Sequence, residues 1–91
     1  MSTVSPRLIR WVEEHFQAPG SASAVVEELS SLEQGERVQA AVALWSWGNY
    51  PKFREALQVA REDWRDALVR AGLENDNWPH LLDLNLGRVD D

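Results

Sequence analysis

Cysteine is absent from the chain, and residue patterns typical of catalysis are scarce. Without Cys there is no disulfide scaffold, no thiolate zinc site and no cysteine nucleophile. The longest strictly apolar run, residues 40–45, is far too short to cross a bilayer, and the polar N-terminal segment carries no targeting signal. We therefore expect a cytoplasmic protein with no membrane partner.

Basic charge is also limited, because nine basic residues stand against fifteen acidic ones and the net charge is −6. A surface of this sign repels phosphate backbones at long range, so we expect no nucleic-acid partner. One alternative stays open, in which an acidic face mimics DNA or a row of arginines directs the protein to nucleic acid. The five glycines are scattered, which excludes a glycine-rich phosphate loop.

Histidine occurs only twice, as His15 and His80, whereas metal sites in proteins usually need three or more converging ligands. Zinc-type spacings such as His-Glu-x-x-His are missing, so we expect no bound metal and no other cofactor. A second hypothesis for the function stays open. If the two ends of the chain pack together, both histidines and nearby carboxylates would form a small metal-dependent or acid–base enzyme.

Helical spacing dominates the sequence. Apolar residues recur at three- and four-residue intervals over 6–17, 22–30, 32–47, 51–71 and 78–84. The pattern predicts an all-α fold, with each of these segments burying one apolar face.

The expected architecture is one domain over residues 1–91, a small irregular or orthogonal bundle of about four to five helices. The segment 32–47 is apolar nearly all round, which is typical of a central helix against which the others pack. The chain ends, 1–5 and 87–91, are expected to be loose.

Two segments leave alternatives open. The stripe over 51–71 is the longest in the chain, yet Asp63 and Asp66 have the spacing of a cap that would split it into two helices. Near the C-terminus, apolar and polar residues alternate as in a strand; with no second strand to pair with, we favour a helix there. The alternating residues are Leu82, Leu84 and Leu86.

Capping residues occur where the helices are expected to begin and end. Gly72 is in the usual position after a helix, where a left-handed backbone is favoured. Ser31 and Gln34 have the spacing of a capping box before the central helix. Single N-caps are expected at Ser5, Asn49 and Asn77.

The apolar stripes predict the core. Replacing either Trp64 or Leu57 with Ala is expected to cost on the order of 2–5 kcal/mol. The predicted core residues are Leu8, Val12, Phe16, Leu29, Val38, Val42, Trp45, Phe53, Leu57, Ala60, Trp64 and Leu68.

Three stretches of the sequence, 37–41, 47–49 and 63–73, combine Arg-Val-Gln-Ala-Ala, Trp-Gly-Asn and Asp-Trp-Arg-Asp followed by Ala-Gly-Leu. Together they resemble a group of small bacterial all-helical proteins in which an Asp-aromatic-Arg-Asp helix ends in Ala-Gly. The resemblance covers about half of the chain. It implies a helical fold and a bacterial source, and it implies no activity or site residues.

Surplus tryptophan is the best functional lead, because the chain has five, and Trp and Arg are enriched where proteins bind one another. Either all five complete the core or some form an exposed patch. We expect a non-catalytic interaction or regulatory module that binds an unidentified protein or a second copy of itself. The candidate partner-binding residues are Trp11, Trp47, Tyr50, Trp78, Arg54, Arg61 and Arg65.

Overall fold

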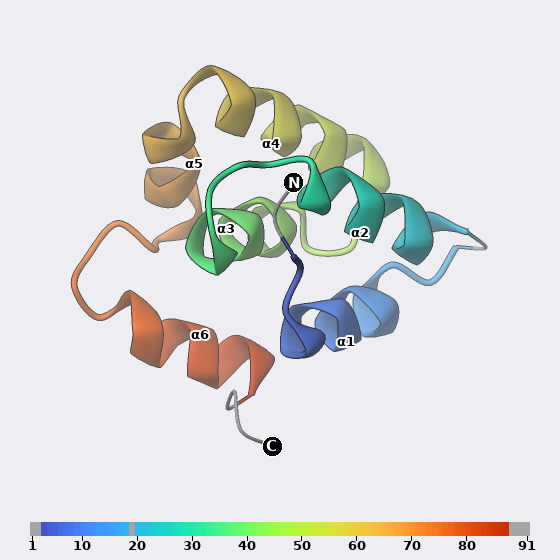
Figure 1. Ribbon diagram of the computed structural model, residues 1–91, viewed down its shortest axis with the longest axis horizontal. Helices are drawn as coiled ribbons and strands as arrows, with labels where there is room; N and C mark the ends of the chain where they lie inside the picture. The colour runs from blue at the N-terminus through green and yellow to red at the C-terminus, as the bar shows by residue number, and fades with distance from the viewer. Residues whose placement is uncertain (1–2, 19, 88–91) are drawn as a thin grey trace.

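The computed structural model describes residues 3–18 and 20–87, and these form six α-helices and no strand (Figure 1). The predicted all-α fold is therefore confirmed. The helices are α1 (Pro6–His15), α2 (Ser21–Ser30), α3 (Glu36–Ser46), α4 (Tyr50–Glu62), α5 (Trp64–Ala71) and α6 (Trp78–Leu86).

Helix α3 is central, as its apolar composition predicts. It packs against α1, α4, α5 and α6, and Figure 1 shows α4 and α5 on one side of it with α1 and α6 on the other. The Gln39 amide of α3 also donates to the Leu29 carbonyl at the end of α2, at 3.1 Å. The unbroken run from Val38 to Ala43 is buried, since every side of this helix meets a neighbour.

The predicted stripe over 51–71 is split at Asp63. This residue has extended backbone angles, φ −156° and ψ 97°, and its carboxylate accepts a hydrogen bond from the Arg65 backbone N–H at 3.1 Å. Asp63 thus ends α4 and caps α5. The interruption changes the helical phase, and the side chains that α5 buries are Ala67 and Leu68.

The prediction that Trp64 lies in the core is wrong for this reason. As the first residue of α5, Trp64 is 37% exposed, and the Arg65 guanidinium lies 5.3 Å from the centre of its ring. Ten of the twelve predicted core residues are buried, and Trp45 is partly buried against the core, where Arg70 covers its ring at 5.0 Å.

Several predicted caps are present. The Ser5 hydroxyl accepts a hydrogen bond from the Leu8 N–H, and the Asn49 carboxamide oxygen accepts one from the Lys52 N–H at 2.9 Å. Gly72 ends α5 with φ 77°.

The start of the central helix was predicted too early. It begins at Glu36 after Gly35, which offers no side-chain cap. The Ser31 hydroxyl donates to the Glu28 carbonyl at 2.6 Å, so Ser31 stabilises the end of α2 and does not cap the next helix. Asn77 precedes α6 without a side-chain hydrogen bond to it.

The C-terminal segment is a helix, so the strand alternative is excluded. Leu82 and Leu86 are buried one turn apart, while Leu84 is on the opposite side and is 67% exposed. Within residues 3–18 and 20–87, no helix is long and apolar enough to cross a membrane.

The ends expected to be loose include residues 1–2 and 88–91, which lie outside the described residues. Val4, Ser5 and Gly87 make specific contacts. Val4 is buried in the core, and the other two join a network of polar groups described below.

Candidate functional site

Trp47 stands out at the junction of α3 and α4. It is 64% exposed, and it closes α3 in a left-handed conformation with φ 50° and ψ 42°. Among the described residues it is the only one other than glycine with a positive φ. A left-handed backbone costs an L-residue roughly 1–2 kcal/mol, which is why glycine usually occupies this position.

Two residues of α1 support the Trp47 ring. Trp11 and His15 stack on each other with ring centres 4.0 Å apart and planes at 15°. The centre of the Trp47 ring is 5.8 Å from that of Trp11 and 5.6 Å from that of His15, with the planes tilted by more than 50°. We call these three residues the aromatic corner. Trp11 is its buried base and Trp47 its exposed edge.

The hydrogen bonding of His15 fixes the orientation of its ring. Its Nδ1 atom lies 2.8 Å from the Trp11 carbonyl oxygen. A carbonyl only accepts, so Nδ1 carries the hydrogen, and the neutral ring has its lone pair at Nε2. The imidazole is thereby held parallel to the indole of Trp11.

Gly48 allows the α3–α4 connection to pack closely against the end of α1. A Cβ at this position would lie 2.5 Å from the His15 carbonyl oxygen, closer than packed atoms allow, and the φ of 84° also favours glycine. The backbone after Trp47 therefore rests directly on the end of α1. A close backbone contact between α1 and the α3–α4 connection therefore lies behind the aromatic corner.

Two other predicted aromatic residues lie elsewhere. Tyr50 starts α4 half-buried, with its ring centre 6.0 Å from that of Phe53. Trp78 starts α6, where the Arg37 guanidinium covers its ring at 5.0 Å. Arg37 also donates two hydrogen bonds to the Leu73 carbonyl, at 2.9 and 2.7 Å, so Trp78 and Arg37 together fasten the α5–α6 connection to α3.

The predicted arginine row is not one continuous patch. Arg54 and Arg61 of α4 both approach the Glu28 carboxylate of α2, at 3.6 and 3.2 Å. Arg61 also donates to the Ser31 hydroxyl at 3.0 Å. These contacts link α4 to α2 and to the residue that follows it. Arg65 lies over the ring of Trp64.

The two histidines are not brought together. His15 ends α1 and His80 is in the first turn of α6, and these helix ends lie on opposite sides of the molecule in Figure 1. In the part of the chain that the structure describes, no three His, Asp or Glu side chains are placed to hold a metal ion.

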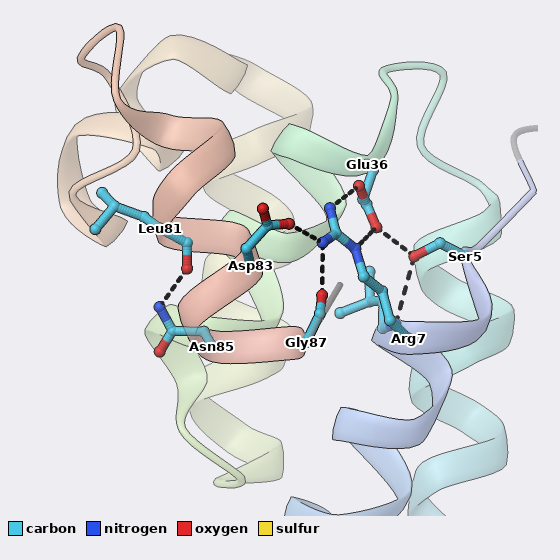
Figure 2. Close-up of polar contacts among 8 residues, drawn as sticks. Ser5, Arg7, Glu36, Leu81, Asp83, Asn85 and Gly87 are labelled. Atoms are coloured by element: carbon cyan, nitrogen blue, oxygen red, sulfur yellow. Dashed lines mark hydrogen bonds and ion pairs between the residues drawn. The ribbon is translucent and has the colours of Figure 1, made fainter. Parts of the chain in front are cut away.

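A buried arginine network was not predicted. Arg7 is 6% exposed at its side chain, and its Nε and Nη2 atoms donate to the two oxygens of Glu36 at 2.8 and 2.7 Å. Its Nη1 atom donates to Asp83 and to the Gly87 carbonyl, both at 2.7 Å, and the Ser5 hydroxyl donates to Glu36. Figure 2 shows the guanidinium between Glu36 on one side and Asp83 and Gly87 on the other.

Hydrogen bonding within this network shifts both charged groups toward their ionised forms. The hydrogen bonds from Arg7 hold the pKa of Glu36 below its usual value, although burial opposes the shift. The bond to Glu36 raises the pKa of Arg7 against the effect of burial. Each carboxylate is paired with Arg7, so the network fastens α1 to α3 and α6.

Comparisons of the chain with protein-family models, with curated proteins and with solved structures found no match. The resemblance to small bacterial helical proteins therefore stays a prediction.

Proposed function

We propose that this protein is a non-catalytic interaction module that inserts Trp47 into an apolar pocket of a partner protein. The observation that carries the proposal is the position of Trp47, which is the most exposed of the tryptophans and has a left-handed backbone. The chain places its largest side-chain type at a site where glycine would be less strained. Backbone strain of this kind is concentrated at functional positions in proteins.

Exposure of the indole adds to the argument. Trp buries more apolar surface than any other side chain when a partner covers it, and it is enriched among the residues that dominate binding free energy. A side chain that served the core alone would be covered by its own fold, as Trp11 is.

The support from α1 lowers the entropic cost of binding. Trp47 rests against Trp11 and His15, and Gly48 fixes the backbone behind it. A ring held in place before binding loses less freedom than a mobile one, so more of the contact free energy remains for affinity. The net charge of −6 favours a partner with a basic surface.

A comparative capture experiment tests the proposal. The wild-type chain and the variants Trp47→Gly and Trp64→Ala are immobilised at equal density and exposed to lysate of the source organism, and retained proteins are quantified. Trp64 is the matched control, because it is also a partly exposed tryptophan but lies at the start of a helix.

We expect one protein to be retained by the wild-type chain and by Trp64→Ala but not by Trp47→Gly. A photo-crosslinking amino acid at position 47 should then attach to that same protein. Identical retention by all three chains would contradict the proposal, provided that circular dichroism shows Trp47→Gly to be folded.

A further inference from the structure

A groove between α1 and α2 forms a second surface, separate from the aromatic corner. The two helices are consecutive and pack against each other, and their hairpin lies at the right of Figure 1. The groove has a volume of about 550 Å³. Ile9, Ala22 and Val26 supply apolar atoms to it, and Glu13 and Glu27 add a carboxylate from each helix.

The residues that line the groove come from about one turn of each helix and from the connection between them, where Ala18 and Gly20 lie. Ile9 and Glu13 are one turn apart on α1, and Ala22 and Val26 are one turn apart on α2. Side chains four residues apart form a ridge along a helix, so each helix contributes a short ridge to the groove. A surface of this shape accepts the apolar ridge of a third helix.

The carboxylates beside this groove differ in their ion pairing from the neighbouring carboxylate of α2. Glu28, the next residue along α2, is within ion-pair distance of two arginines of α4. In the described part of the chain, neither Glu13 nor Glu27 has a basic side chain within that distance. Both carboxylates are exposed beside half-buried apolar residues, and an incoming cation would meet no competing internal partner.

We infer that the α1–α2 groove binds a basic amphipathic helix of a partner protein. The apolar ridge of that helix packs on Ile9, Ala22 and Val26, and Lys or Arg side chains on its two flanks pair with Glu13 and Glu27. Charge complementarity favours this occupant over a second copy of the chain. Each copy carries a net charge of −6, so the carboxylates beside the groove would repel the acidic surface of another copy.

Titration with a synthetic helix tests the inference. The probe is a helical peptide of about fifteen residues with a leucine ridge flanked by lysines. It is added to the ¹⁵N-labelled chain, and amide shift changes are mapped by NMR. We expect the changes to centre on Ile9, Glu13, Ala22, Val26 and Glu27 and to leave α5 unaffected.

Charge variants supply the matched control. The double variant Glu13→Gln/Glu27→Gln should weaken the dissociation constant about tenfold or more. The double variant Glu55→Gln/Glu74→Gln removes the same net charge from exposed residues outside the groove and should change it less than about twofold. Equal weakening by both would mean non-specific attraction and would overturn the inference.

Two further measurements complete the test. Ala22→Trp fills the groove and should abolish peptide binding while circular dichroism stays unchanged; retained binding by that variant would also overturn the inference. Concentration-dependent dimerisation with the same amide shift changes would assign the groove to a second copy instead. Trp47→Gly should bind the peptide normally, so failure here is distinguishable from failure of the proposal for Trp47.

Discussion

The two sides of α3 share one apolar core but differ in the polar contacts beside it. On one side, α4 and α5 pack through apolar side chains such as Phe53, Leu57 and Leu68, all of them buried. On the other side, the junction of α1 and α6 contains a buried guanidinium with two carboxylates and a backbone carbonyl. Apolar packing tolerates changes in pH and salt, whereas a buried ion pair requires that every partner be present and charged.

The largest effect is expected on the apolar side. Leu57→Ala should lower the free energy of unfolding by about 2–5 kcal/mol, because Leu57 is buried between α4 and its neighbours and the variant leaves a cavity. Chemical denaturation measures the change. A loss below about 1 kcal/mol would mean that this side can collapse around the missing atoms.

On the ionic side, Glu36→Gln should cost about 2–3 kcal/mol. Gln keeps one acceptor oxygen for the buried Arg7, but its NH₂ group cannot accept the second hydrogen bond, and the compensating negative charge is lost. Amide hydrogen exchange should accelerate in α1, which the Arg7–Glu36 pair joins to α3, more than in α4. Glu55→Gln, at an exposed position, is the control and should change stability by less than about 0.5 kcal/mol. Uniform acceleration in both helices would contradict a local role for the network.

Acidification should weaken the ionic side of α3 more than the apolar side. Because the pKa of Glu36 is lowered in the folded state, its contribution is present above the usual glutamate pKa and is lost as the pH falls through the lower, folded value. The raised pKa of Arg7 keeps that group charged throughout this range. Wild-type protein should therefore lose more stability on acidification below about pH 4 than Glu36→Gln does. If the stability of the wild-type protein and that of Glu36→Gln fall equally as the pH is lowered, the Arg7–Glu36 ion pair does not make this contribution.

Trp64→Ala should have a smaller effect, about 1 kcal/mol. The spacing of apolar residues predicts the same cost for Trp64 as for Leu57, but Trp64 is partly exposed at the start of α5. Its removal opens space to solvent and leaves no enclosed cavity. If the thermal midpoints of Trp64→Ala and Leu57→Ala agree, the split at Asp63 does not hold in solution.

The smallest effect is expected for Trp47→Gly, within about 0.5 kcal/mol of wild type. Relief of the left-handed strain should offset the lost contacts with Trp11 and His15. Differential scanning calorimetry measures this change in stability. A loss above about 2 kcal/mol would show that Trp47 serves the fold, and the proposed function would lose its main support.

The apolar side was predictable because its signals are local. Helix spacing placed Phe53 and Leu57 in the core, and Asn49 and Gly72 marked helix ends through contacts within a few residues. Even the split at Asp63 was foreseen as an alternative. The choice between one helix and two required tertiary packing, and for that reason the position of Trp64 was predicted wrongly.

The ionic side was not predictable because its partners are far apart in the chain. Arg7 is separated by 29 residues from Glu36 and by 76 from Asp83, and no local pattern distinguishes it from the exposed Arg10. The aromatic corner has the same difficulty. Trp47 was named as a candidate from its place at a helix end, but its support by His15 depends on how α1 meets the α3–α4 connection.

The hydrogen bond between Arg7 and Gly87 also constrains the order in which segments can fold during synthesis. Arg7 leaves the ribosome 80 residues before Gly87, whose carbonyl it binds. Until Gly87 has been synthesised, the Nη1 group of Arg7 lacks one of its protein acceptors, and water must accept that hydrogen bond instead. The first helix therefore cannot reach its final environment until the chain has been translated through Gly87, after every other helix in the described part of the chain.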